Sequence, residues 1–398
     1  MTLHPRWIRR SGPPLPAFLA DRIAAPLDAR TGQHRTAAIL GDETPPADAV
    51  RMQSNDYLSL ARDPRIALAK SRALLRQGHG DAVSRVFTHH KPDAHRAFER
   101  RMARLLGVED SVLTMSGYSA NVGLIQALAA PDTPVYVDKM AHASLWDGIT
   151  SAGATPIAFA HNDVADLAAK IAATGPGLIL VDALYSQNGN LCPLRDMVDT
   201  AETTGCALVV DETHSFGCHG PDGAGLCAAL GLDDRVHFRT IGLSKAMAAR
   251  GGIVAGCAQA MSFLRFEARP MIFSTSVLGY EIAGFEATLD IFRDEPQRRR
   301  ALAHNHRCLR TGLAALGYDV SESDSQILSI LIGDDDTTIA FRKALVAEGV
   351  VGSVFCAPAV PRGRAIIRLT VNAGMTAQDI TRVFAAFERL TAMPRLAA

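Results

Sequence analysis

The sequence predicts an α/β fold with a large, mostly parallel β-sheet, followed by a smaller C-terminal α+β domain. Seven short apolar or β-branched runs between residues 111 and 257 have the composition of buried strands. Helical stretches rich in Ala and Leu separate most of these runs. Parallel strands that are covered on both faces are apolar along their whole length, so this alternation favours a parallel sheet between two layers of helices.

The elements follow one another in three expected regions: an irregular N-terminal arm (1–50) with a short helical stretch near 16–28, a large α/β domain (51–290) and a small α+β domain (291–398). The expected strands of the large sheet are 111–114, 134–138, 155–159, 177–182, 206–211, 236–241 and 252–257. The expected helices among them are 93–106, 119–130, 164–173 and 194–203. A charged stretch at 293–300 begins a long helix to about residue 316, and strands 326–332, 351–356 and 365–371 follow with two helices.

The composition excludes several classes of protein. In the 398 residues, 41 Lys and Arg balance 41 Asp and Glu, which leaves no electrostatic footprint for nucleic acid or an anionic membrane. The seven cysteines form no CxxC pair, and no apolar run approaches the ~18 residues that a membrane span needs. We therefore expect a cytoplasmic protein with reduced thiols that binds neither nucleic acid nor membranes.

Reactive side chains follow four of the expected strands. In an open parallel sheet, ligands bind at the carboxyl ends of the strands, so these side chains are expected to converge. They are His142 after strand 134–138, Ser186 after strand 177–182, Asp211 and His214 at the end of strand 206–211, and Ser244 and Lys245 after strand 236–241.

This set of residue types has a specific chemical use. A lysine can form a Schiff base with pyridoxal phosphate (PLP), and a carboxylate can keep the pyridine nitrogen protonated so that the ring withdraws electrons. One histidine can stack on the ring, and a second histidine or a serine can address its phenolic oxygen. The phosphate needs backbone N–H groups at the start of a helix. Ser116, Gly117 and Tyr118 lie between an expected strand and an expected helix and suit that task.

Other chemistries are less well supported. Residues 117–121 (GYSAN) are one residue away from the G-x-S-x-G nucleophile elbow, so a serine hydrolase that uses Ser119 is an alternative from another class. The glycines of 220–225 have the wrong spacing for a dinucleotide fingerprint, and the chain has no G-K-[ST] motif. His89, His90 and His95 have no carboxylate or cysteine at a spacing that completes a metal site, so we expect no metal.

The signature Asp211-Glu-Thr-His214-Ser-Phe-Gly, followed by Ser244-Lys245, resembles the D-E-[AS]-H-[SA]-x-G … K pattern of the α-oxoamine synthases. These are PLP-dependent acyl-CoA:amino acid C-acyltransferases of fold-type I. Further segments that resemble the family, in its order, are Ser54-Asn55-Asp56-Tyr57-Leu58, Ser84-Arg85 … His95 … Phe98-Glu99, Asp138 … His142-Ala-Ser144, Phe273-Ser274-Thr275-Ser276 and Pro358 … Arg368. The resemblance covers most of the chain and implies this fold, PLP as the cofactor, and acyl-CoA and amino acid substrates.

Four sequence segments resemble one branch of this family more than the others. Residues 53–58, 142–148, 236–238 and 352–356 look most like the branch that makes quorum-sensing autoinducers, which are long-chain α-aminoketones or α-hydroxyketones. The alternatives within the family are 8-amino-7-oxononanoate synthase and glycine C-acetyltransferase. In the family, an arginine and two prolines are usual around 356–358, where this chain has Cys-Ala-Pro.

The resemblance also implies roles for individual residues. Lys245 is expected to hold PLP and to act as the base, and Asp211 to keep the ring nitrogen protonated. His214 and Ser186 are expected at the phenolic oxygen. His142 is expected to stack on the ring and to donate a proton as the thioester is attacked.

Substrate and partner contacts are implied in the same way. Arg368 is expected to bind the substrate carboxylate, with Asn55 close by. The implied assembly is a homodimer with shared active sites, in which Ser274 and Thr275 of one chain reach the phosphate bound by the other.

One departure from the family concerns the phosphate. Members usually have Thr or Ser three residues before the lysine, in contact with the phosphate, and this chain has Gly242 there. We expect Thr240 or Ser244 to compensate.

The acyl chain needs an apolar channel if the product is a signal of the autoinducer type. The apolar segments 15–19 and 351–355 are candidates for its lining. The alternative is that both segments pack in the core or at a dimer interface.

Overall fold

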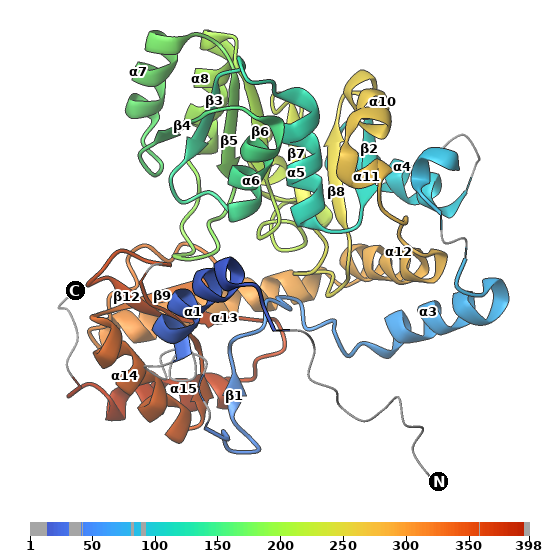
Figure 1. Cartoon of the computed structure of the whole chain (residues 1–398). Coiled ribbons are helices and arrows are strands. Elements are labelled where there is room, and N and C mark those ends of the chain that lie inside the picture. The colour runs from blue at the N-terminus through green and yellow to red at the C-terminus, as the bar shows by residue number, and fades with distance from the viewer. Residues whose placement is uncertain are drawn as a thin grey trace.

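The computed structural model describes residues 14–31, 41, 43–80, 83–88, 93–357 and 359–393. A seven-stranded sheet forms the centre of its larger part, in the order β2-β8-β7-β6-β5-β3-β4 (Figure 1). Strands β3 to β7 run parallel to their neighbours within the set, and only β8 pairs antiparallel, with both β2 and β7. The predicted α/β fold with a mostly parallel sheet is therefore confirmed. Its strands are β2 (Asp110–Thr114), β3 (Val135–Asp138), β4 (Pro156–Phe159), β5 (Leu178–Asp182), β6 (Ala207–Asp211), β7 (Phe238–Gly242) and β8 (Gly252–Gly256).

Helices cover both faces of this sheet because successive strand residues point to opposite sides. On β5, Ile179 and Val181 pack against α7 (Val164–Thr174) and α8 (Leu194–Thr204), whereas Leu178 and Leu180 pack against the opposite layer. The opposite layer contains α5 (Gly117–Leu128), α6 (Ala143–Ala152), α10 (Ala258–Glu267) and α11 (Arg269–Ile272). This two-sided burial accounts for the continuous apolar strands seen in the sequence.

A smaller, antiparallel sheet lies in the C-terminal part, in the order β11-β12-β9. Figure 1 shows it, with its helices, below the large sheet. Its elements are β9 (Ile327–Gly333), α14 (Asp335–Ala347), β11 (Ser353–Phe355), β12 (Ala365–Thr370) and α15 (Ala377–Arg389). The short strand β1 (Val50–Arg51) pairs with β10 (Val350–Val351), so the chain near residue 50 is anchored to the C-terminal part.

Four further helices link the two parts or flank them: α3 (Pro64–Gln77), α4 (Ala94–Leu106), α12 (Gly279–Asp294) and α13 (Pro296–Ala315). The long helix expected from 293–300 to about residue 316 is α13, which begins at Pro296, whereas α12 is a further helix that ends just before it and was not predicted. Proline lacks the N–H that a helix interior needs but fits a first turn. The expected domain boundary at 290/291 falls inside α12, and the division into domains stays a prediction.

The apolar segments considered for an acyl channel differ in their surroundings. Leu15, just before α1 (Ala17–Thr31), and Phe18 within it are exposed, by 56% and 70%, so neither packs in the core of the single chain. Val351 is buried in the core through the β1–β10 pair.

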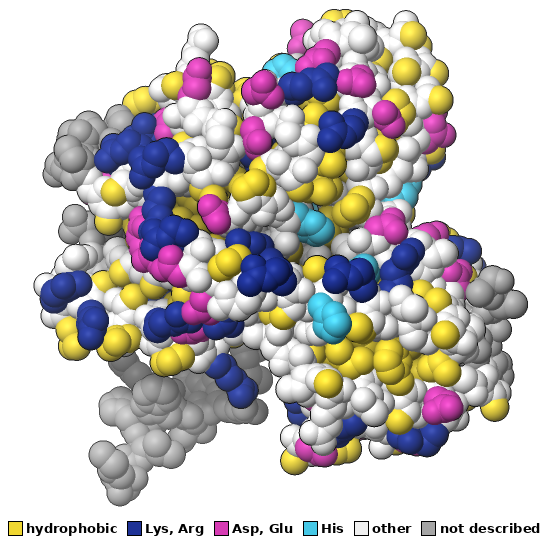
Figure 2. Space-filling view, turned by 180° about the vertical axis from the view of Figure 1, so that it is seen from behind, with side chains coloured by type: hydrophobic (Ala, Val, Ile, Leu, Met, Phe, Trp, Pro, Cys, Tyr) yellow, Lys and Arg dark blue, Asp and Glu magenta, His cyan; other side chains and the backbone are white. Residues whose placement is uncertain are grey.

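In the part of the chain that the structure describes, no helix is long and apolar enough to cross a membrane. Figure 2 shows basic and acidic side chains interspersed on one face of the molecule.

Candidate active site

A cavity of about 650 Å³ opens at the carboxyl edge of the large sheet. Eight of the expected site residues line it: Ser116, Gly117, Tyr118, His142, Asp211, His214, Ser244 and Lys245. They come from the N-termini of α5 and α6 and from the segments that follow β6 and β7. The residues that line it without having been expected are Asn121, Ser144, Asp182, Leu184, Thr213 and Gly242.

Asp211 is held in place by two hydrogen bonds. Its Oδ2 accepts from Asn121 Nδ2 at 2.7 Å, and its Oδ1 accepts from the Thr213 backbone N–H at 2.8 Å. Only 6% of the residue is exposed. Asn121 was missed by the sequence analysis, although a signal existed: it is a polar residue among the buried apolar residues of α5. A buried amide needs partners, and these are Asp211 and Ser144.

His142 caps the N-terminus of α6, and its ring is oriented by Ser144. The Ser144 hydroxyl accepts from Asn121 Nδ2 at 2.8 Å and lies 2.7 Å from His142 Nδ1, to which it can donate. The Ser144 backbone N–H also donates to Nδ1, at 3.3 Å. The His142 backbone N–H donates to Asp182 Oδ2 at 3.2 Å. Burial, and then repulsion from Asp211, raises the pKa of Asp182 well above its usual value.

The two other reactive groups are also desolvated. Burial, followed by the positive charges of Lys245 and Arg368, lowers the pKa of His214 well below its usual value, so its ring is neutral at pH 7. Burial, followed by repulsion from Arg368, lowers the pKa of the Lys245 amine. A lysine with a depressed pKa has more of the neutral form, which is the nucleophile and the base.

Two backbone segments that line the cavity, the start of α5 and the end of β7, lie very close together. A Cβ atom built on Gly117 would lie 2.7 Å from Gly242 Cα, so the start of α5 meets the end of β7 with no room for a side chain at Gly117. A Cβ on Gly242 would lie 3.0 Å from Thr213 Cγ2 and 3.2 Å from its Oγ1. The Gly242 N–H donates to Thr213 Oγ1 at 2.7 Å. Thr213 therefore places a hydroxyl beside Gly242, a contact that was not predicted from the sequence.

Of the two residues expected to compensate for Gly242, Ser244 lines the cavity and Thr240 does not. Thr240 is buried in β7 beside Asp211, and its hydroxyl is without a hydrogen-bond partner. Ser186 also does not line the cavity. Asn55 and Arg368 lie outside the lining too, but they meet each other, because Arg368 Nη2 donates to Asn55 Oδ1 at 3.0 Å.

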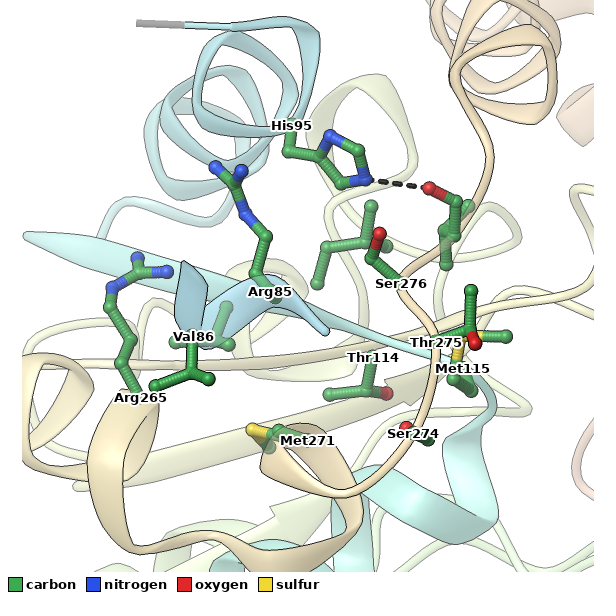
Figure 3. Close-up of a pocket in the computed structure, with 13 residues that line it drawn as sticks. Arg85, Val86, His95, Thr114, Met115, Arg265, Met271, Ser274, Thr275 and Ser276 are labelled. Carbon is green, nitrogen blue, oxygen red and sulfur yellow. Dashed lines mark hydrogen bonds between the residues drawn. The ribbon is translucent and has the colours of Figure 1, made fainter. Parts of the chain in front are cut away.

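Ser274 and Thr275 line a different, small pocket between the segments 83–88 and 272–277 (Figure 3). The Ser276 N–H donates to Val83 O at 3.1 Å, and His95 Nε2 lies 2.6 Å from Val277 O. His89 and His90, considered with His95 for a metal, lie outside the described residues. Within a single chain, then, Ser274 and Thr275 are not brought to the Lys245 cavity.

Ser119, the alternative nucleophile, hydrogen bonds Ser116 Oγ through its own hydroxyl at 2.9 Å. It does not line the cavity that contains His142 and His214. Nucleophilic serine chemistry needs a base within hydrogen-bond reach, and a serine hydroxyl is not one.

The donor set of the cavity fits PLP. It offers a half-buried lysine with a depressed pKa, a carboxylate fixed by two donors, a neutral histidine, and the N-terminus of a 12-residue helix whose first residue is Gly117. Such a helix start favours a phosphate.

Comparison with known proteins decides the family. The family model for aminotransferase class I and II matches residues 47–387. The chain belongs to this family. Proteins that resemble it include the CAI-1 autoinducer synthase of Vibrio campbellii, which is 39% identical over 96% of this chain and 97% of its own. The 8-amino-7-oxononanoate synthase of Anaeromyxobacter dehalogenans is 36% identical over 85% of each chain.

Solved structures agree with this membership. A serine palmitoyltransferase from S. paucimobilis with a bound PLP–myriocin aldimine has a TM-score of 0.86 and 26% identity, over 93% of this chain and 98% of that one. The serine palmitoyltransferase of Sphingomonas wittichii has a TM-score of 0.86 and 25% identity, over 94% and 98%. The predicted fold-type I architecture, the enzyme class of α-oxoamine synthases and PLP as cofactor are therefore confirmed.

Proposed function

We propose that this enzyme condenses a medium-chain acyl-CoA with an α-amino acid, or with S-adenosylmethionine, to an α-aminoketone that is a precursor of a quorum-sensing autoinducer. A carbon–carbon bond forms between the amino acid Cα and the acyl carbonyl carbon, the carbon–sulfur bond breaks, and CoA leaves as the thiol. Loss of the amino acid carboxylate as CO₂ leaves the ketone. The supporting observation is similarity over 96% of the chain to a CAI-1 autoinducer synthase.

The residues of the cavity supply what this reaction needs. PLP, when bound, withdraws electrons from the substrate Cα so that its proton can be removed. Lys245 would hold the cofactor and take that proton, a task that its depressed pKa favours. Asp211 would keep the pyridine nitrogen protonated through a charged hydrogen bond. His142, which lines the same cavity, would stack on the ring and donate a proton to the thioester oxygen.

Arg368 is the proposed site for the substrate carboxylate. Its guanidinium is 5% exposed, and its Nε has no hydrogen-bond partner. A buried guanidinium with an open donor favours an anion. Asn55, which accepts from Nη2, keeps the guanidinium in one orientation.

We further propose that the enzyme is a homodimer in which Ser274 and Thr275 serve the partner's cofactor phosphate. Two observations support this. Both residues lie in the Figure 3 pocket and not in the Lys245 cavity of their own chain. Beside them, Phe273 and Phe87 are 76% and 69% exposed, which is unusual for phenylalanine and typical of an interface.

The cofactor assignment is tested first, by covalent capture. The purified enzyme with PLP should be yellow, and borohydride should fix the cofactor to Lys245, as located by peptide mass spectrometry. Lys245→Ala should fold and show no captured cofactor. Ser119→Ala should remain active. A colourless protein whose esterase activity is lost in Ser119→Ala would instead establish the hydrolase alternative.

The acyl chain length is tested with a panel of acyl-CoAs and amino acids, read by release of CoA. Acyl chains of about eight to ten carbons, the length implied by likeness to autoinducer synthases, should outperform acetyl-CoA and pimeloyl-CoA. The gain should be up to ~0.8 kcal/mol per methylene until the channel is full.

A second candidate function is that of 8-amino-7-oxononanoate synthase, because such an enzyme is 36% identical over 85% of this chain. An acyl group with a terminal carboxylate needs a cation at the end of its channel, whereas a signal synthase needs only apolar lining. Preference for pimeloyl-CoA in the panel would therefore overturn the autoinducer proposal and replace it with this one.

A further inference from the structure

A chain of hydrogen bonds joins the small sheet to the Lys245 cavity. Arg368, on β12, donates to Asn55 Oδ1 at 3.0 Å. The Tyr57 hydroxyl lies 3.3 Å from the same oxygen and 2.5 Å from His214 Nδ1. His214 follows β6 and lines the cavity. Tyr57 is therefore the link between Arg368 of the small sheet and His214 of the large one.

This link is closed to water. Tyr57 has no exposed surface, and His214 and Arg368 are 7% and 5% exposed. Burial also raises the pKa of Tyr57, so its hydroxyl keeps its proton. The His214 ring is neutral, because its pKa lies well below the usual value. A neutral imidazole carries one N–H, and the group bonded to one ring nitrogen decides which nitrogen carries it.

The Tyr57 hydroxyl has one proton and two acceptors within reach, His214 Nδ1 and Asn55 Oδ1. The contact to Nδ1 is 2.5 Å and the contact to Oδ1 is 3.3 Å, so the imidazole nitrogen is the closer of the two acceptors. Asn55 Oδ1 already accepts a hydrogen bond from the charged guanidinium of Arg368, so a second donor stabilises this oxygen less. Donation by Tyr57 along this shorter contact makes His214 Nδ1 an acceptor and leaves the ring proton on Nε2.

We propose that Tyr57 is a positioning residue that fixes His214 as the Nε2–H tautomer, so that His214 donates a hydrogen bond to the cofactor's phenolic oxygen. This inference rests on the proposed function of the cavity as the PLP site. A donor at that oxygen stabilises its anionic form, whereas the other tautomer would present a lone pair to it and repel it.

The second histidine of the cavity is built on the same pattern. His142 Nδ1 faces the Ser144 hydroxyl at 2.7 Å and accepts from the Ser144 backbone N–H, which also directs a ring proton to Nε2. In both histidines a neighbouring hydroxyl engages Nδ1 and leaves Nε2 for the cavity. Two independent instances argue that the tautomer is specified by the fold.

The test measures the tautomer itself. The full-length chain, labelled with ¹⁵N-histidine and loaded with PLP, is examined by ¹⁵N NMR, and the His214 signals are those that His214→Asn removes. We expect a bare Nδ1 and a protonated Nε2 in the wild type. In Tyr57→Phe we expect a substantial Nδ1–H population and a shifted absorption band of the bound cofactor.

Activity provides a second readout. In Tyr57→Phe, kcat should fall about tenfold or more, with little change in KM for the acyl-CoA, because a lost orienting partner changes the chemistry and not the binding. Tyr136→Phe is the matched control, since Tyr136 is equally buried and its hydroxyl donates to Gly175 O at 2.6 Å, remote from the cavity lining. It should leave the His214 tautomer and kcat unchanged.

Two results would overturn the proposal. One is a protonated Nδ1 in the wild type, which does not depend on Tyr57→Phe and so is informative even where that variant does not fold. The other is an unchanged His214 tautomer in a folded Tyr57→Phe. Neither result bears on the proposed function, which fails separately if borohydride does not fix PLP to Lys245.

Discussion

At the scale of single residues, the site consists of reactive side chains that are held in place by buried polar side chains. Asp211 and Lys245 could be predicted because they follow apolar strands, and parallel strands bring their carboxyl ends together. Asn121 and Thr213 could not be assigned in the same way. The role of each depends on a hydrogen-bond partner that is distant in sequence: Asp211 for Asn121, and Gly242 for Thr213.

The charge of Asp211 gives a prediction at this scale. In Asp211→Asn the side chain has the same shape, but it no longer stabilises a protonated ring nitrogen, and its new NH₂ group faces a donor, either Asn121 or the Thr213 N–H. We expect turnover to fall roughly 100-fold or more, by analogy with the loss of one preorganised electrostatic contact. The measurement is the rate of CoA release, with circular dichroism to check the fold.

The control for that substitution is Asp63→Asn. Asp63 caps α3 and accepts from the Arg65 backbone N–H, and asparagine is an equally good cap. Its turnover should equal that of the wild type. Near-normal turnover in Asp211→Asn would exclude Asp211 from the role proposed for it.

At the scale of elements, the strands were predictable and some helices were not. Buried strands are visible as apolar runs whatever their neighbours are. By contrast, α6 was not predicted, because its ten residues include Gly148 and several weak helix formers, and its stability comes from packing on α5 and on the sheet. The same dependence on tertiary contact governs the start of α5, where Gly117 touches Gly242.

That contact gives the second prediction. In Gly117→Ala the new methyl would lie 2.7 Å from Gly242 Cα, so α5 and β7 must separate. We expect a loss of ~1–3 kcal/mol in the free energy of unfolding, as for other overpacked sites. We also expect weaker binding of PLP, measured by titrating the apo-enzyme, because the helix start would move away from the phosphate.

Gly279→Ala is the matched control for this change. It also lies at the first position of a helix, but the nearest atom to its new methyl is Gln77 Oε1 at 3.5 Å, an ordinary contact. Its stability and its PLP affinity should stay close to those of the wild type. Equal effects in the two variants would mean that the close approach at Gly117 has no special role.

At the scale of the whole molecule, the sequence placed Ser274 and Thr275 in the site only through resemblance, and a single chain does not bring them to Lys245. Patterns of apolar residues describe what one chain buries. They do not say which surface residues act in another chain. The contacts that join Asn55, Tyr57 and Arg368 could not be predicted from sequence patterns either, because a contact between the two sheets cannot be read from either sheet alone.

Subunit mixing tests the shared site. Lys245→Ala and the double variant Ser274→Ala/Thr275→Ala should each have low activity alone. In an equal mixture that is allowed to exchange subunits, each hybrid dimer would have one site with both sets of native residues, so about a quarter of the wild-type rate should return. No gain over the separate variants, with exchange verified by differently tagged chains, would mean that these residues do not act across a dimer.

The antiparallel strand β8 has a consequence for how the chain matures. Residues 110–114 of β2 and 238–242 of β7 are not neighbours in the finished sheet, because 252–256 of β8 lies between them. During synthesis β2 emerges long before β8. Strand β2 can therefore join the sheet only after β8 has been made, and pairing between strands so distant in sequence is slow. Lys245 lies in the link between β7 and β8. Its position therefore depends on the pairing of β8 with β7, which fixes both ends of that link.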